Sequence, residues 1–163
     1  MTENPTVITF CLGTAHFALP VAPVLEILEV GDIAPLPRTP PALLGLIDRH
    51  GVSVPVIDLR IRLGMPGTEP TDDTRVIVLR AGVRNDRNLT VGVRVDRVIE
   101  VTELDGAVTE PLSEAELLHW QTAAVRGIGR RNDHFVTLLD IDGLFAEDID
   151  ELNGNVVPDA ALS

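Results

Sequence analysis

The amino-acid sequence repeats itself, and this repetition limits the possible folds more than any other feature. Three blocks align in the same order in both halves of the chain: 7–12 with 76–81, 17–27 with 91–101, and 45–63 with 127–145. The aligned positions keep Gly, Arg, Glu and Asp as well as apolar residues, so strand composition alone does not explain the match. The sequence therefore predicts two copies of one small structural unit.

Each copy has the pattern of short β-strands. Residues 7–12 and 16–21 are apolar or alternating around a Gly13-Thr14 turn, and residues 75–81 and 88–95 repeat this around a polar loop. Val, Ile and Leu dominate while aromatic residues make up 3%, which suits strands. Closely spaced strands with Gly and Pro turns predict small barrels or sandwiches rather than a parallel α/β sheet. The residues expected in the core include Val56, Ile57, Leu59, Val93 and Val136.

Short helices are expected where a capping residue stands at the right place. Asp58 and Asp140 each take the N-cap position after an apolar strand, and Asp140 begins a C-terminal helix predicted over about residues 140–152. Residues 39–45 (TPPALLG) also read as a short helix that Thr39 caps and Gly45 ends.

The pattern predicts a single domain over residues 1–152. Its two lobes are expected over about residues 7–64 and 75–146, facing each other across a groove. Residues 153–163 are small and polar and are predicted to form a disordered tail.

Charge and hydropathy argue against several classes of partner. A formal net charge of −12 disfavours nucleic acid and anionic membranes, which both attract basic proteins. No apolar run reaches the roughly 20 residues that cross a bilayer. The N-terminal residues MTENPT lack the basic start of a signal peptide. We therefore expect a cytoplasmic protein with no nucleic-acid partner and no direct membrane binding.

Side chains suited to catalysis or metal binding do not form a recognisable motif. There is no G-x-S-x-G, P-loop, GxGxxG or HExxH, and the single Cys11 lies in an apolar strand. The histidines are far apart and share no metal-ligand spacing. No catalytic residue, metal or cofactor is expected. The alternative, a small enzyme or metal-binding barrel, predicts a bound metal or a deep pocket with clustered titratable groups.

One stretch carries a family resemblance. Residues 45–66, GLIDRHGVSVPVIDLRIRLGMP, are similar to the pattern G-x-x-N-L-R-G-x-x-x-P-V-x-D-L-R. Residues 10–30 look like the opening hairpin and V-x-E-I segment of the same family, and residues 36–45 look like its next loop and short helix. From about Val7 to Leu152 the chain resembles the CheW family of chemotaxis coupling proteins and the CheW-like domain of the histidine kinase CheA.

The resemblance implies a fold and a function. The fold would be mainly β, with two five-stranded SH3-like barrels on a shared core, short helices and a C-terminal helix. The function would be that of a non-catalytic adaptor in two-component signal transduction, coupling chemoreceptor tips to a CheA-type kinase at membrane-associated receptor arrays. An alternative is a specialised CheW-like scaffold of a non-chemotaxis kinase pathway. The partner-binding residues implied are Val24, Glu26, Ile27, Gly45, Asp48, Arg49, His50 and Val52.

One segment departs from the family pattern. Where the family has Asn-Leu-Arg-Gly, this chain has Asp48-Arg49-His50-Gly51. On an extended segment Arg49 and His50 point in opposite directions, and His is shorter than Arg and mostly neutral at about pH 7. The departure is compatible with a divergent receptor, a non-motility pathway or competition with a standard CheW. It is equally compatible with an exchange of roles between Arg49 and His50 through a shifted turn.

Overall fold

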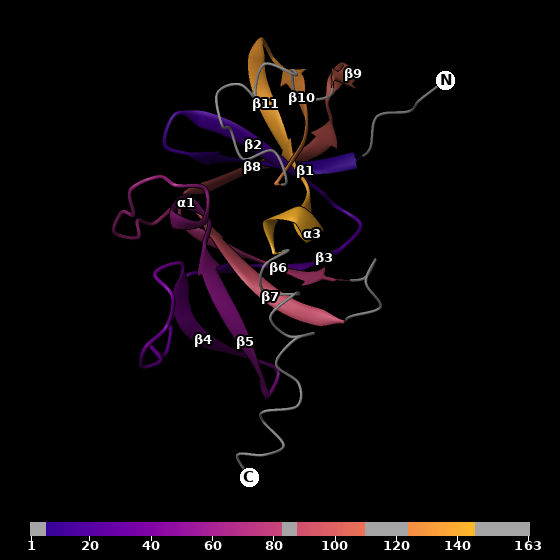
Figure 1. Ribbon diagram of the computed structural model, residues 1–163. Coiled ribbons are helices and arrows are strands. Elements are labelled where there is room, and N and C mark those ends of the chain that lie inside the picture. The colour runs from indigo at the N-terminus through magenta and orange to yellow at the C-terminus, as the bar shows by residue number, and fades with distance from the viewer. Residues whose placement is uncertain (1–5, 83–87, 110–123, 146–163) are drawn as a thin grey trace.

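The computed structural model describes residues 6–82, 88–109 and 124–145. The described residues are mainly β-strands with two single-turn helices (Figure 1). The strands of the first half are β1 (Thr6–Leu12), β2 (Ala15–Pro20), β3 (Val24–Glu29), β4 (Leu43–Arg49) and β5 (Val52–Asp58), followed by helix α1 (Leu59–Arg62). Those of the second half are β6 (Arg75–Ala81), β7 (Leu89–Val95), β8 (Arg97–Glu103), β9 (Asp105–Thr109), β10 (Val125–Arg131) and β11 (His134–Leu139), followed by helix α3 (Ile141–Leu144).

The strands form two sheets with the same internal order. Sheet A runs β8-β1-β2-β11-β10-β9 and sheet B runs β3-β6-β7-β5-β4, so each strand of sheet B has a repeat counterpart in sheet A. We call the two halves of the molecule lobe A and lobe B after these sheets. Figure 1 shows them one above the other, with α1 and α3 between them. The expected mainly β fold with two SH3-like lobes is confirmed, but in sheet A β9 adds a sixth strand beside β10.

The lobes do not follow the expected ranges 7–64 and 75–146. Sheet B uses β3 to β7, whereas sheet A combines β1 and β2 with β8 to β11 from the other half of the chain. The reason is the pairing of β3, which joins β6 of the second repeat, while β1 joins β8. The two repeats have therefore exchanged their first hairpins: β1–β2 lies between β8 and β11, and β6–β7 lies between β3 and β5.

Strand alternation divides the apolar side chains between three clusters. On β6, Ile77 and Leu79 point into a core shared by the two lobes, whereas Val76 and Val78 point into lobe B. On β1, Ile8 and Phe10 point into the shared core, whereas Val7 belongs to a small cluster inside lobe A. The five residues predicted in the core, Val56, Ile57, Leu59, Val93 and Val136, are all buried.

The two helices begin where the sequence predicts. Asp58 Oδ1 accepts a hydrogen bond from the Arg60 N–H at 3.0 Å, and Asp140 Oδ1 accepts one from the Gly143 N–H at 3.0 Å. Both helices contribute to the shared core, through Leu59 in α1 and Ile141 and Leu144 in α3. The part of the predicted 140–152 helix after residue 145 and the 153–163 tail lie outside the described residues.

The predicted helix over residues 39–45 is wrong. The Leu43 N–H donates to the Pro40 carbonyl at 3.0 Å, which makes one turn, and strand β4 begins at Leu43. Leu43 pairs with Ile57 of β5 and packs against the shared core. Strand pairing and burial therefore override the helical signals of Thr39 and the two prolines.

Candidate partner-binding site

Glu26, Arg49 and His50 come together at one end of lobe B. Arg49 Nε lies 2.7 Å from Glu26 Oε2, and His50 Nε2 lies 3.9 Å from the same oxygen. Glu26 is on β3 and Arg49 is on β4, which are the two edge strands of sheet B. The ion pair therefore links the two edge strands of sheet B.

A tight turn explains why two neighbouring side chains reach one carboxylate. His50 and Gly51 have φ values of +52° and +83°, and the flanking Arg49 and Val52 pair across the hairpin. Such positive φ values are typical of the two-residue turns that join antiparallel strands. The expected opposite orientation of Arg49 and His50 is wrong, because His50 lies in this turn and not in a strand. Its imidazole stays 76% exposed.

Lobe A contains the same arrangement at the repeated positions. Arg131 Nε lies 3.3 Å from Glu100 Oε2, and Arg131 Nη1 lies 3.3 Å from Asp105 Oδ1. Hydrogen bonding to Glu100 raises the pKa of Arg131 above its ordinary value. The turn beside it, Asn132-Asp133, also has positive φ at both residues. An Arg–Glu pair across the sheet is thus a property of the repeated unit.

The other expected binding residues fall into exposed and structural positions. Ile27 and Val52 expose 41% and 60% of their surfaces, and Asp48 is also exposed. Val24 is half-buried and packs against the shared core. Ile27 belongs to β3 and Val52 to the start of β5, so the exposed apolar positions come from two strands of lobe B.

Gly45 is a structural residue of this region. It is buried with a φ of +147°, and a Cβ atom there would lie 2.1 Å from the Ala34 carbonyl oxygen. Ala34 forms an isolated bridge with Leu46, with N···O distances of 2.8 and 2.9 Å. Gly45 therefore allows the 30–42 connection to pack directly on β4.

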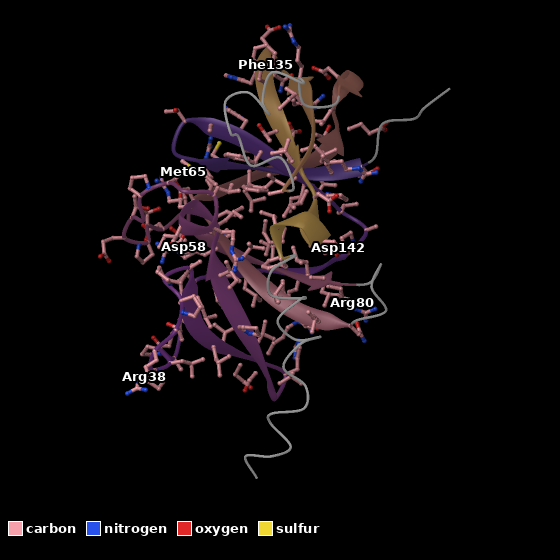
Figure 2. The ribbon with its side chains drawn as sticks, in the orientation of Figure 1. Arg38, Asp58, Met65, Arg80, Phe135 and Asp142 are labelled. Atoms are coloured by element: carbon pink, nitrogen blue, oxygen red, sulfur yellow. The ribbon has the colours of Figure 1, made fainter. Side chains whose placement is uncertain are left out.

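Further exposed apolar residues were not among the expected site residues. In lobe B these are Leu25 and Leu36, and in lobe A they are Ile99, Val101 and Phe135. The alignment of 17–27 with 91–101 places Ile99 and Val101 at the positions of Leu25 and Ile27, so the repeat could have located them. The repeat does not indicate Phe135 in the same way. This residue is 67% exposed and lies beneath the Arg130 guanidinium, at the far end of lobe A (Figure 2).

A polar cleft lies near the junction of the lobes. Its volume is about 340 Å³, and Arg60, Asp96, Arg97 and Cys11 are among its lining residues. Arg60 and Asp96 form an ion pair, and Asp96 Oδ2 also accepts the Gly13 N–H at 2.7 Å. Hydrogen bonding from Arg60 lowers the pKa of Asp96. The charged groups of the cleft thus join α1 to the β1–β2 turn.

No group of three or more potential metal ligands occurs among the described residues.

Comparison with known proteins places these features in one family. Residues 6–148 match the family model of the CheW-like domain. The chain belongs to the CheW-like family. The chemotaxis protein CheW of Helicobacter pylori is 30% identical over 141 residues, which cover 86% of this chain and 81% of that protein. The CheW of Bacillus subtilis is 27% identical, with 94% and 93% covered.

A solved CheW structure has the same fold. The crystal structure of the scaffolding protein TtCheW from Thermoanaerobacter tengcongensis aligns with a TM-score of 0.73 and 26% identity, over 88% of this chain and 93% of that chain. As a CheW-like protein, the chain is a chemotaxis coupling adaptor, and proteins of this family are scaffolds that are generally non-catalytic. Among the described residues no helix is long and apolar enough to span a membrane.

Proposed function

We propose that this CheW-like protein is a non-catalytic adaptor that links the cytoplasmic tips of chemoreceptors to a CheA-type histidine kinase. The observation that carries the proposal is the family match over residues 6–148. The stretch with the most specific resemblance, residues 45–66, contains the exposed β4–β5 hairpin. A hairpin that presents Val52 and His50 to solvent suits recognition of a partner. The adaptor would work in the cytoplasm and be recruited to receptor arrays through its partners.

Within lobe B, we assign two kinds of role to the proposed receptor-binding residues. The exposed Ile27, Asp48, His50 and Val52 would contact the partner, because their side chains are available on the surface. Glu26, Arg49, Gly45 and Val24 would act by positioning that surface, because they are engaged in the ion pair, the bridge region and the core. An apolar helix of a receptor hairpin, bordered by polar side chains, fits such a surface.

Binding and kinase assays test this proposal. The purified protein should bind CheA and receptor fragments from its own organism and raise CheA autophosphorylation when both are present. Ile27→Glu should reduce receptor capture about tenfold or more, because it places a charge in an apolar contact. Val101→Glu, at the repeat-equivalent position in lobe A, is the matched control and should leave receptor capture unchanged. Binding to neither fragment would overturn the proposal.

A second candidate is a scaffold for a different kinase pathway. One observation favours it: the Asp48-Arg49-His50 segment departs from the family pattern. His50→Arg restores the family residue beside Glu26. If a standard receptor–kinase pair is the partner, we expect this variant to bind it more tightly. Equal or weaker binding would show that His50 is not the altered contact.

A further inference from the structure

Two imidazole rings stack across a strand junction in lobe A. His16 on β2 and His134 on β11 have ring centroids 4.3 Å apart and an interplanar angle of 15°. The two strands run parallel and pair over only three positions, from His16 and Val136 to Ala18 and Leu138. This junction joins the exchanged hairpin of the first repeat to the second repeat. Because the rings lie face to face, their in-plane nitrogens do not converge on one point, and the pair does not form a shared metal site.

The groups around the two rings carry positive or no charge on most sides. On β1, Cys11 lies opposite His16, and on β8, Arg97 lies opposite Cys11 and donates to its Sγ at 3.8 Å. On β10, Arg131 pairs with His134. The nearby carboxylates, Glu100 and Asp105, already bind Arg131, and Asp133 is an exposed turn residue. Within the described part of the chain, neither ring lies within 4.0 Å of a carboxylate oxygen.

We propose that the His16–His134 stack is a pH-sensitive contact that holds β2 and β11 together when the rings are neutral and separates them when the rings take up protons. Neutral imidazoles stack favourably, whereas two imidazolium ions at this separation repel each other, and Arg97 adds a further positive charge. Among the described residues, the nearby carboxylates Glu100 and Asp105 are already paired with Arg131. The separation would move the β10–β11 hairpin, including the exposed Phe135, relative to the rest of lobe A.

The direction of the pH effect follows from the environment of His16. Burial, followed by the charges of His134 and Arg97, lowers the pKa of His16 below its ordinary value of 6.5. The unfolded chain therefore binds protons more readily than the folded chain as the pH falls. The contact contributes fully above about pH 6.5 and is lost at lower pH. The inference concerns the fold alone and does not depend on the proposed adaptor function.

Substitutions drawn from the repeat itself test the proposal. His134 aligns with Val52 of lobe B, so His134→Val replaces one ring with the residue that the same strand position carries in the other lobe. The urea denaturation midpoint of wild type should decrease when the pH is lowered from about 7.5 to about 5.5. The midpoint of His134→Val should decrease by less than about half as much over the same range. His50→Asn, in the exposed turn of lobe B, is the control and should respond like wild type.

Hydrogen exchange separates loosening of the junction from general acid destabilisation. The parallel β5–β7 junction is the repeat equivalent of β2–β11 and has no histidine. After correction for the intrinsic exchange rate, protection of β2 and β11 amides should fall about tenfold more than protection of β5 and β7 amides over the same pH range. If His134→Val does not fold, His134→Gln takes its place in both experiments. Equal pH responses of the two junctions, or a wild-type response from the variant, would overturn the proposal.

Discussion

Arg49 and His50 show that two neighbouring side chains can approach one carboxylate when one of them lies in a turn. The family pattern has an Arg at the position of His50. In this chain Arg49 makes the 2.7 Å contact with Glu26. His50 approaches the same carboxylate at 3.9 Å, so the opposite orientation expected of the two side chains is wrong. Periodicity could not reveal this arrangement, because alternation assumes an extended chain and His50 has a φ of +52°.

Gly45 and Gly51 provide a residue-scale prediction. Gly45→Ala should destabilise the protein by about 3 kcal/mol or more, because the new Cβ cannot coexist with the Ala34 carbonyl and the bridge must open. Gly51→Ala is the control: it also has positive φ, but no atom lies within 4 Å of the added carbon, so it should cost only about 1 kcal/mol. Urea denaturation measures both values, and similar costs would contradict the packing argument.

At the scale of elements, the two Arg–Glu ion pairs predict a difference between the lobes. A double-mutant cycle with Glu26→Gln and Arg49→Ala should give a coupling free energy of about 0.5–1 kcal/mol, because the pair is only half-buried. The equivalent cycle on Glu100 and Arg131 should give a smaller coupling, because the contact is longer and Arg131 also binds Asp105. Denaturant titrations of wild type, the four single variants and the two double variants measure both couplings, and a larger value in lobe A would refute this ranking.

The contact between α1 and the β1–β2 turn predicts a second pH effect. The hydrogen bond from Arg60 lowers the pKa of Asp96 below its ordinary value, so ionised Asp96 stabilises the fold above that value, and the stabilisation is lost as the pH falls through the lowered pKa. Asp96→Asn should therefore be less stable than wild type at about pH 7, and the difference should shrink below about pH 4. Asp48→Asn is the exposed control. A difference that stays constant with pH would exclude the ionised carboxylate as its source.

The elements differ in how far the sequence predicted them. Hairpins and caps were predicted correctly, because Gly13 and Asp58 act on neighbours a few residues away. The 39–45 helix was wrong because contacts with β5 decide the conformation of Leu43. The lobe ranges were wrong because periodicity indicates which residues face a core but not which distant strand pairs with β3. The expected site residues converge only in part, since Gly45 and Val24 serve packing.

At the scale of the whole molecule, the shared core predicts unfolding as one unit. Val93 belongs to the shared core and Val136 to the small cluster inside lobe A, and both are buried. Val93→Ala and Val136→Ala should each cost about 1–3 kcal/mol and shift the same single transition. Val52→Ala, which is exposed, should cost less than about 0.5 kcal/mol. Circular dichroism and hydrogen exchange measure the transitions, and independent melting of one lobe would contradict the prediction.

The hairpin exchange also determines the order in which a growing polypeptide can assemble. All strands of sheet B have been synthesised once β7 ends at Val95. The β1–β2 hairpin is made first, but its partner β11 ends only at Leu139. During translation the earliest segment therefore waits longest for its neighbours, with apolar side chains such as Phe10 lacking their final surroundings. Among the described strands, those of the β1–β2 hairpin therefore remain longest without their complete sheet.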